Sequence, residues 1–383
     1  MHSKTILMLS HSFAPNTGGV ETHLTDLTQY LSVNQIPCFV LTYQPLITKA
    51  KGKFLERMGS VTVCRLPWIG FGLFNILERF PLLQFLYLFP VLFVASFFVT
   101  LINCRKITAI HCHGMVCAVM GRVLKSIFRK KTIVSIHAVY GWLYNLKGAG
   151  ALPSFLKWVL SGCDSILSLA EKSRKELIDM GIPENKARIF TYWVNQELFR
   201  PMDRDDSRKN IQIDEKFTVL FVGRLIKVKG VETLMEVAIN LKDIQFVFAG
   251  DGPLTPTLKS IAKQHSNIRM LGSVDNSKLP CCYNAADILC VPSQYEEGFG
   301  RIILEALSCG CPVIGSRRGG IPEAMDESVG LLIEPDKDSI QASILSLRSD
   351  VNRLERLRAH CRKFAINRYS QENARMITEE YYS

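Results

Sequence analysis

Residues 287–315, DILCVPSQYEEGFGRIILEALSCGCPVIG, decide the fold of this chain. The apolar run Ile288–Val291 predicts a buried parallel strand, and Gly298–Gly300 predict a tight turn into a helix with apolar residues at helical spacing. Gly310 ends that helix, and Pro312–Ile314 begin the next apolar run. The stretch is therefore a strand–helix–strand unit whose helix starts beyond the carboxyl end of a strand, where open α/β sheets bind ligands.

Two carboxylates frame the turn: Glu297 stands before the glycines and Glu305 lies about one helical turn inside. A helix N-terminus carries free backbone N–H groups that suit an anion, so the amides of Gly300, Arg301 and Ile302 are candidates to bind a diphosphate. The carboxylates would then accept hydrogen bonds from the hydroxyls of a sugar nucleotide. Taken alone, such a pair is more often a helix-dipole partner and a solvated helix residue.

The longer stretch 297–323, EGFGRIILEALSCGCPVIGSRRGGIPE, resembles the signature of family 4 retaining glycosyltransferases, with Glu297 and Glu305 on its two glutamates. The other matching positions are GFG, EA, CG-PVI and GGIPE. The resemblance implies the GT-B fold, an α/β architecture in which two facing Rossmann-like doubly wound domains enclose a cleft. It also implies that Glu297 faces the donor hexose, that Glu305 binds the ribose hydroxyls and that Phe299 belongs to the donor-binding set.

The length of 383 residues predicts two domains, because it exceeds one ordinary core. We expect an N-terminal domain over residues 1–195 and a C-terminal domain over residues 196–383. The resemblance implies that the first binds the acceptor, that the second binds the nucleotide sugar, and that a final helix from Ser370 crosses back to the first. Residues 1–195 hold 21 Lys and Arg against 9 Asp and Glu, a net charge of +12, whereas the remainder carries −1.

The 12 cysteines form no C-x2-C pair, and no histidine cluster has zinc-finger spacing. We interpret them as small buried apolar residues in a reducing cytoplasm. The start, MHSKTILMLS, has too short an apolar run for a signal peptide and predicts a first strand over Thr5–Ser10.

A Gly-Gly pair follows the first predicted strand, in the loop Pro15–Glu21 that leads into a helix over Glu21–Leu31. Backbone can approach a ligand closely at Gly18 and Gly19, although most such pairs are plain turns. In the family, P-x-x-GG-x-E-x-H is the usual first loop and lies over the donor diphosphate and the acceptor. The resemblance therefore assigns Gly18 and Gly19 to donor binding, with His23 on the helix that follows.

Two further predicted strands, Thr108–His111 and Thr132–His137, carry histidine at their carboxyl ends. A lone histidine there is more often structural than catalytic. In the family, however, the histidine after the later strand faces the transferred hexose, and this position is His137. His111 and His113 are interpreted as structural or acceptor-side residues.

Two cations follow the predicted strand Val219–Val222, in the sequence GRLIKVKG. Arginine can fork two phosphate oxygens and lysine supplies a compact charge, although basic loops are usually just solvated. The match to the family's GRL-x-x-x-KG assigns Arg224 and Lys229 to the diphosphate. Leu271 lies in a segment, MLGSV, that resembles the one beside the nucleobase.

The segment Ile189–Pro201 resembles the family's interdomain segment, N-G-V-D-x-x-x-F-x-P. It departs from that pattern with Tyr192 and Trp193 in place of Asn-Gly and with Asn195 in place of Asp. We expect the same fold with altered contacts at the bend.

The segment 81–103, PLLQFLYLFPVLFVASFFVTLIN, carries no charge over 23 residues, enough to cross a bilayer core. A span would place Gly18–Gly19 and the strand Thr108–His111 on opposite sides of the membrane and split one sheet, and two prolines interrupt the run. Three alternatives stay open: a fully buried helix, an element that rests in the membrane interface or receives a lipid tail, and a true span. Basic residues nearby favour the interfacial alternative, because anionic headgroups attract Arg79, Arg105, Lys106, Arg122, Lys125, Arg129, Lys130 and Lys131. We expect a cytoplasmic protein peripherally associated with the cytoplasmic face of an anionic membrane.

Sugar transfer from a nucleotide develops negative charge on the departing diphosphate, and Arg224, Lys229 and the helix amides are candidates to stabilise it. Asp-x-Asp occurs only at 203–205 and 336–338, neither at a nucleotide site, so we expect no metal and no cofactor. No nucleophilic carboxylate is evident near His137, which agrees with the front-face retaining mechanism that the resemblance implies.

The predicted function is retaining hexosyl transfer from UDP- or GDP-hexose to a lipid-linked or polysaccharide acceptor of lipopolysaccharide, capsule or exopolysaccharide. The catalytic candidates are His137, Glu297, Arg224 and Lys229. A sugar-nucleotide epimerase would need an acid–base set and no lipid-facing element. A nonenzymatic membrane-bound sugar-binding protein would not need Arg224, Lys229 and the two glutamates together. No nucleic acid partner is expected, and the sequence does not reveal the donor base, the hexose, the acceptor or the oligomeric state.

Overall fold

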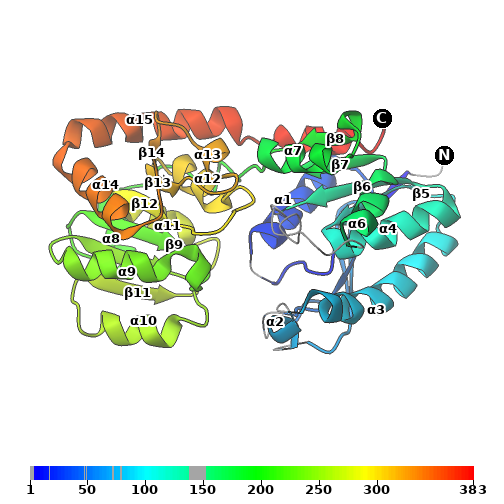
Figure 1. Cartoon of the computed structure of the whole chain (residues 1–383), viewed down its shortest axis with the longest axis horizontal. Coiled ribbons are helices and arrows are strands. Elements are labelled where there is room, and N and C mark those ends of the chain that lie inside the picture. Colours follow the sequence, from blue (N-terminus) through cyan, green and yellow to red (C-terminus); the bar gives the residue numbers. More distant parts are fainter. Residues whose placement is uncertain are drawn as a thin grey trace. The chain divides into compact units, whose positions relative to one another are not determined.

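The computed structural model describes residues 4–16, 18–46, 48, 50–70, 73–77, 80–137 and 152–383, so Arg79 lies outside the described residues. They form two compact units, each with helices packed around one mainly parallel sheet (Figure 1). Unit 1 takes the chain up to Tyr192 together with Glu372–Ser383, and unit 2 is Trp193–Gln371. The predicted α/β class with two doubly wound sheets is confirmed.

The sheet of unit 1 has the strand order β3-β4-β2-β1-β5-β6-β7-β8, and its pairs are parallel except for β3 with β4. Its strands are β1 (Thr5–Leu9), β2 (Cys38–Tyr43), β3 (Leu55–Met58), β4 (Val61–Leu66), β5 (Ile107–His113), β6 (Lys131–Ile136), β7 (Ser165–Ser168) and β8 (Ala187–Ile189). Its helices are α1 (Gly19–Val33), α2 (Leu73–Leu77), α3 (Pro81–Ile102), α4 (Met115–Phe128), α6 (Leu152–Ser161), α7 (Glu171–Asp179), the 3₁₀ turn η1 (Glu184–Lys186) and α16 (Asn373–Glu379).

The sheet of unit 2 is parallel throughout, in the order β11-β10-β9-β12-β13-β14. Its strands are β9 (Thr218–Val222), β10 (Gln245–Ala249), β11 (Ile268–Gly272), β12 (Ile288–Val291), β13 (Val313–Ser316) and β14 (Gly330–Ile333). Its helices are α8 (Arg204–Ile211), η2 (Lys227–Lys229), α9 (Val231–Asn240), α10 (Thr255–Ala262), α11 (Leu279–Ala285), α12 (Arg301–Ser308), α13 (Ile321–Ala324), α14 (Lys337–Ser349) and α15 (Val351–Arg368).

Each sheet has one point at which the order of its strands reverses. In unit 1 the reversal lies between β1 and β5, and in unit 2 it lies between β9 and β12. The loops leaving two adjacent strands run in opposite directions there and leave room at the carboxyl ends, which is where doubly wound sheets bind ligands. Each unit therefore has one place where its topology favours a site.

The deciding stretch 287–315 folds as predicted, into β12, α12 and β13. All four residues of β12 are buried, as expected for a parallel strand covered on both faces. All 12 cysteines are free and ten are buried, with Cys104 and Cys281 partly exposed. Their interpretation as small apolar core residues is confirmed for those ten.

The last residues of the chain are held against the sheet of unit 1. The hydroxyl of Tyr381 lies 2.8 Å from Nδ1 of His111 on β5. At the start of β6, Nζ of Lys131 donates to the backbone oxygen of Ser383 at 2.7 Å. These contacts explain why α16 belongs to unit 1 although it follows the helices of unit 2.

Helix α3, the uncharged segment, is fully buried against unit 1 along one stripe only. Leu88, Leu92, Ser96 and Thr100, spaced four residues apart, are buried, and α3 lies against α4. The opposite stripe is apolar and at least half exposed, and comprises Leu82, Leu83, Leu86, Val94, Phe98, Leu101 and Ile102. The alternative of a fully buried helix is therefore wrong. By length and composition, Leu82–Ile102 is the one described helix that could cross a membrane, with a mean hydropathy of 2.4.

A buried tyrosine ties α3 to the sheet next to Pro90. The hydroxyl of Tyr43, at the end of β2, donates to the backbone oxygen of Leu88 at 2.8 Å and accepts from the backbone N–H of Leu92 at 2.9 Å. The hydroxyl thus stands between two groups that a regular helix would join directly. This insertion makes the middle of α3 part of the core of unit 1.

Two glycines of unit 2 hold positions that other residues cannot adopt freely. Gly230, after η2, has φ +70°, and an added Cβ would lie 2.0 Å from the backbone oxygen of Pro292. Gly319 has φ +57°, and its Cβ would lie 2.1 Å from the backbone oxygen of Glu297. Both glycines therefore let a neighbouring segment approach the loop that follows β12.

We expect Gly230→Ala to lower the free energy of unfolding by about 3 kcal/mol, because positive-φ strain of about 1–2 kcal/mol adds to a backbone clash. Gly272→Ala tests strain alone, since φ is +70° but no atom lies within 4 Å of the added Cβ, and it should cost about 1 kcal/mol. Gly19→Ala meets neither obstacle and should be neutral. Urea unfolding of the three variants provides the measurement, and equal losses at Gly230 and Gly272 would contradict the clash.

Candidate functional site

The reversal point of unit 2 brings together two loops that are far apart in sequence. One loop leaves β9 and contains η2, and the other leaves β12 and leads into α12. A backbone hydrogen bond of 2.8 Å from Gln294 N–H to the oxygen of Val228 joins them. The residues around Lys229 and Glu297 therefore form one local structure.

The carboxylate of Glu297 is buried and accepts three hydrogen bonds at this junction. Oε1 accepts from Nζ of Lys229 at 2.5 Å and from the hydroxyl of Ser293 at 2.6 Å. Oε2 accepts from the hydroxyl of Tyr295 at 2.9 Å. Glu297 is only 6% exposed, so it is more than a surface partner of the helix dipole. Three donors fix its orientation.

Lys229 keeps its charge in this half-buried position. Burial is the largest single influence and by itself would lower the pKa of the ammonium group, but Glu297 and Tyr295 together outweigh it and the pKa is raised. Nζ also lies 5.2 Å from the centre of the Tyr295 ring, a cation–π distance. The junction therefore holds a permanent cation whose position is set by one carboxylate and one aromatic ring.

The backbone of Glu297 is held by the GGIPE segment. The N–H of Gly320 donates to the oxygen of Glu297 at 2.8 Å, and the N–H of Gly319 donates to Oε2 of Glu296 at 2.6 Å. The close approach requires the missing side chain of Gly319 described above. Gly319 and Gly320, late in the stretch 297–323, therefore help to position Glu297 at its start.

Helix α12 begins at this junction with an open N-terminus. Gly300 precedes it at φ +78°, and no side chain caps the first turn. The first backbone N–H groups of α12 therefore have no capping side chain, an arrangement that suits an anion.

Glu305 lies inside α12 and is 3% exposed. It accepts from Nε of Arg301 at 3.1 Å and from the hydroxyl of Tyr283 at 2.8 Å. The alternative of a solvated helix residue is therefore wrong for Glu305. Arg301 is itself 7% exposed, so its guanidinium group serves this internal pair and its backbone amide is the group near the helix start.

The other predicted donor residues of unit 2 lie around the junction rather than in it. Arg224 is exposed on the loop after β9. Leu271 lies half-buried on β11, which β10 and β9 separate from β12 in the sheet. The side chain of Phe299 is buried and packs edge-on against Tyr369, with ring centres 6.2 Å apart. Its backbone, rather than its ring, is available to a ligand.

At the reversal point of unit 1, the glycine pair leads directly into α1. Glu21 in the first turn is buried and accepts from the hydroxyl of Ser12 at 2.5 Å, and Asn16 donates to that hydroxyl oxygen at 3.1 Å. An added Cβ at Gly18 would lie 2.4 Å from the Glu21 carboxylate, whereas Gly19 has open space. Glu21 thus ties the glycine loop to the end of β1.

Beside this loop, four histidines form a cluster in which His23, His111 and His113 are buried and His137 is half-buried. His113 Nδ1 lies 3.0 Å from His137 Nε2, and His137 Nδ1 lies 2.8 Å from the hydroxyl of Tyr192. The ring of His23 packs 4.6 Å from that of Tyr192 and 5.5 Å from that of His137. His111 bonds to Ser135 and to Tyr381 at 2.8 Å each. His111 and His137 are thus held by internal partners at both ring nitrogens.

Burial keeps the imidazoles of His111, His113 and His137 neutral. It lowers the pKa of His111 and of His137 to about 3 and that of His113 well below its usual value. Among the described residues no group of three or more His, Cys, Asp or Glu is arranged to hold a metal ion. The predicted metal independence stays a prediction.

Four partners of the site residues were not found from sequence: Ser293, Tyr295, Tyr283 and Tyr192. Ser293 and Tyr295 lie on the loop that joins β12 to α12, and their position just beyond a predicted strand could have indicated that they belong to the site. Tyr283 lies 22 residues from Glu305, and Tyr192 lies 55 residues from His137. No local pattern joins such pairs, and only folding brings them together.

Two family models match this chain. The model of glycosyl transferases group 1 matches residues 203–367, and that of Glycosyltransferase Family 4 matches residues 17–197. The phosphatidylinositol N-acetylglucosaminyltransferase GPI3 subunit of Saccharomyces cerevisiae is 25% identical over 367 residues, 88% of this chain and 74% of that protein.

Solved structures match over the whole chain. Sucrose-phosphate synthase from Thermosynechococcus elongatus has a TM-score of 0.80 at 20% identity, over 99% of this chain and 98% of that one. Anabaena Alr3699/HepE in complex with UDP and glucose has a TM-score of 0.78 at 19% identity, over 98% of both chains. At these identities the likeness establishes the fold.

We expect acid to destabilise unit 1. The folded-state pKa values of His111, His113 and His137 are depressed, so below the usual histidine pKa of about 6.5 the unfolded chain takes up protons that the folded chain cannot. Their contribution to stability is present above that pH and is lost as the pH falls toward about 3. Urea unfolding between pH 7.5 and 5.0 should show the free energy of unfolding declining as the pH falls. His113→Gln should make this decline smaller. The control variant His360→Gln, on the exposed surface of α15, should leave it unchanged. A slope unchanged by His113→Gln would contradict the assignment.

Proposed function

The chain belongs to the group 1, family 4 glycosyl transferases of the GT-B fold, and from this we propose that it transfers a sugar from a nucleoside-diphosphate donor to a lipid-borne acceptor. We further propose that transfer retains the anomeric configuration.

One observation carries the proposal, the ion pair of the half-buried Lys229 with the buried Glu297 at the reversal point of unit 2. Departure of the nucleoside diphosphate leaves negative charge on the phosphate oxygen that had bonded the sugar, and a cation fixed in position stabilises that charge effectively. Lys229 has three N–H donors, so it can remain paired with Glu297 and still donate to a phosphate. Glu297 then has two functions: it orients Lys229 and offers Oε2 toward the hydroxyls of the donor hexose.

The remaining predicted residues are proposed to contact different parts of the donor. The first amides of α12, at Gly300, Arg301 and Ile302, donate to the diphosphate, and the exposed Arg224 adds a second cation from solvent. Glu305 accepts from the ribose hydroxyls while Arg301 and Tyr283 hold it. Leu271 borders the base. The assignment of Gly18 and Gly19 to donor binding and the contact of His137 with the hexose stay predictions.

The donor is proposed to be a UDP- or GDP-sugar. The Anabaena structure contains UDP and glucose, which supports a uridine donor, and the name of the Saccharomyces relative includes N-acetylglucosamine, which widens the sugar to amino hexoses. That name also includes phosphatidylinositol, which supports a lipid acceptor. Lipopolysaccharide, capsule or exopolysaccharide as the final product stays a prediction. No cofactor and no metal ion are proposed.

The acceptor is proposed to be reached at the cytoplasmic surface of a membrane. The exposed apolar stripe of α3 and the basic residues on and after α4 belong to the same unit, and interfacial binding generally needs both a hydrophobic and an electrostatic contribution. The burial of the other stripe against α4 supports peripheral rather than spanning association.

We expect the protein to hydrolyse one nucleotide sugar slowly when no acceptor is present, and to do so equally in EDTA. The measurement is release of nucleoside diphosphate from a panel of UDP- and GDP-sugars, followed by the configuration of the released or transferred sugar. Loss of activity in EDTA with recovery in Mg²⁺ would contradict metal independence. No turnover of any donor, with acceptor lipids present, would contradict the transferase proposal.

We expect Lys229→Ala and Arg224→Ala each to lower kcat about 10- to 1000-fold, because one contact that stabilises transition-state charge contributes about 2–4 kcal/mol. Lys227→Ala is the matched control: it removes an exposed cation two residues away and should stay within about twofold of native. Steady-state kinetics with the donor identified in the hydrolysis assay provide the measurement. Equal kcat in Lys229→Ala and Lys227→Ala would remove the diphosphate assignment.

We expect the native protein to float with anionic liposomes and Leu86→Gln/Phe98→Gln to bind them about tenfold or more weakly, because each exposed side chain buried in the interface contributes about 1.5–3 kcal/mol. Val351→Gln/Ile366→Gln removes two exposed apolar residues from α15 and serves as the control. The proposal is wrong if the native protein remains in solution with every liposome, or if it resists alkaline carbonate extraction as an integral protein does.

A further inference from the structure

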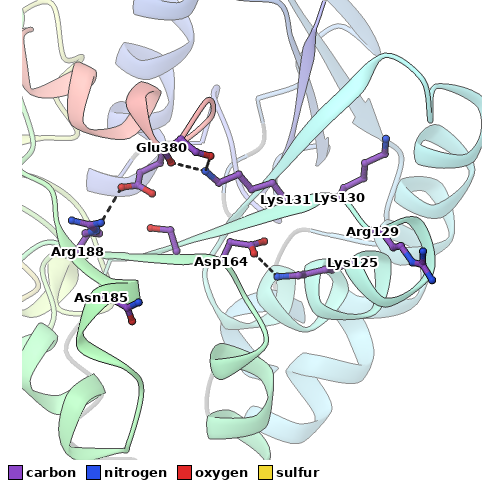
Figure 2. Close-up of a pocket in the computed structure, with 10 residues that line it drawn as sticks. Lys125, Arg129, Lys130, Lys131, Asp164, Asn185, Arg188 and Glu380 are labelled. Atoms are coloured by element: carbon purple, nitrogen blue, oxygen red, sulfur yellow. Dashed lines mark hydrogen bonds and ion pairs between the residues drawn. The ribbon is translucent and has the colours of Figure 1, made fainter.

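Unit 1 contains a pocket of about 570 Å³ that the proposed reaction does not use. It opens where β6 and β7 begin, and its lining residues are Lys125, Arg129, Lys130, Lys131, Asp164, Ser165, Asn185, Arg188, Glu380 and Ser383 (Figure 2). Since β6 and β7 are parallel and Lys131 and Ser165 are their first residues, the pocket lies at their amino ends. His137 follows the carboxyl end of β6, so the pocket and the histidine cluster are at opposite ends of the sheet.

The pocket has a clear excess of positive charge. Five of its residues are Lys or Arg and two are Asp or Glu. Asp164 is already occupied, because Oδ1 accepts from Nζ of Lys125 at 2.6 Å and Oδ2 accepts from the backbone N–H of Thr132 at 2.8 Å. Glu380 lies 3.8 Å from Nε of Arg188. Each carboxylate therefore has its own cation.

Three consecutive cations have no Asp or Glu partner in the described part of the chain: Arg129, Lys130 and Lys131. Lys130 donates to the backbone oxygen of Cys104 at 2.5 Å, and Lys131 donates to the oxygen and the hydroxyl of Ser383 at 2.7 and 2.6 Å. The acceptor of Lys130 is a neutral amide oxygen. Figure 2 shows Lys131 extending from the start of β6 toward Glu380 and Arg188, while Arg129 and Lys130 extend away from Lys131.

A buried hydroxyl group provides a second, independent observation. Ser165 is only 3% exposed, and its Oγ has no hydrogen-bond partner among the residues that the structure describes. It belongs to the lining of the pocket. A buried hydroxyl without a partner is unfavourable in a folded protein, so a polar ligand here would satisfy it.

We propose that this pocket binds a phosphate group. A phosphate offers several acceptor oxygens at once, which match a lysine point charge, an arginine fork and a hydroxyl donor: Lys131, Arg188 and Ser165. The ligand is either free inorganic phosphate or the phosphate group of a phospholipid headgroup. The second source has support from the fold, since Lys130 contacts Cys104, two residues beyond Ile102, which is 78% exposed at the end of α3. The inference does not rest on the proposed reaction, because no lining residue belongs to the donor site.

The test compares phosphate binding by the native full chain with three double variants. Lys131→Gln/Arg188→Gln removes two pocket cations, and Lys51→Gln/Lys53→Gln removes two exposed cations of the same unit outside the pocket. Arg224→Ala/Lys229→Ala removes the cations of the donor site. Equilibrium dialysis against labelled inorganic phosphate should show binding about tenfold or more weaker in the first variant and within about twofold of native in the other two. Binding that survives in Lys131→Gln/Arg188→Gln but is lost in Arg224→Ala/Lys229→Ala would overturn the proposal.

Vesicles distinguish the two sources of phosphate. Phosphatidylcholine vesicles are prepared with phosphatidic acid or, at equal surface charge, with oleate, which is anionic but has no phosphate. A headgroup site predicts preference for phosphatidic acid that is lost in Lys131→Gln/Arg188→Gln. Binding of free phosphate without that preference assigns the pocket to free phosphate. Absence of both kinds of binding overturns the proposal.

A measurement on the native protein covers the case in which the pocket variant does not fold. Acetylation of lysines by an activated ester, read by mass spectrometry, should become slower at Lys131 when phosphate is added, and remain unchanged at Lys51 and Lys53. Equal rates at Lys131 with and without phosphate would contradict the assignment.

Discussion

The ion pair between the half-buried Lys229 and the buried Glu297 is the interaction on which the candidate site depends. Removing Lys229 would leave the carboxylate of Glu297 without its cation away from water, and breaking such a pair typically destabilises a protein by several kcal/mol. The pair is retained because both charges are supported by neighbours: Ser293 and Tyr295 bond the carboxylate, and the Tyr295 ring faces the ammonium. A fixed and permanently charged lysine at the carboxyl ends of β9 and β12 is what a departing diphosphate requires.

The two units use the same topology with different chemistry. Unit 2 places charges at its reversal point and stabilises them by pairing, whereas unit 1 places neutral imidazoles there and keeps them neutral by burial. Tyr192 is part of this difference, because it stands where the family pattern has Asn and its hydroxyl bonds to His137. The altered contacts that the sequence predicted at this bend are therefore hydrogen bonds to the histidine cluster.

The surface of unit 1 combines an apolar helix face with a basic pocket. Lys130 contacts the chain just beyond the C-terminal end of α3, so the two features are continuous along the chain and in space. Tyr43 fixes the middle of α3 in the core, which leaves the outer stripe at a constant place on the surface. An apolar face next to cations that have no Asp or Glu partner is suited to an amphiphilic partner.

The sequence by itself determined the α/β fold and the strand–helix–strand unit around Glu297, because apolar periodicity and glycine turns are local properties of the chain. Its resemblance to the family signature also predicted Lys229, Glu297 and Glu305 as site residues. Only the tertiary structure decided that Glu305 is buried with Tyr283, and that His137 is held by Tyr192 and His113. Those partners are distant in sequence, and no spacing rule relates them. The role of segment 81–103 was undetermined for another reason: an uncharged run has no polar face, so the side that packs is decided by α4 and Tyr43.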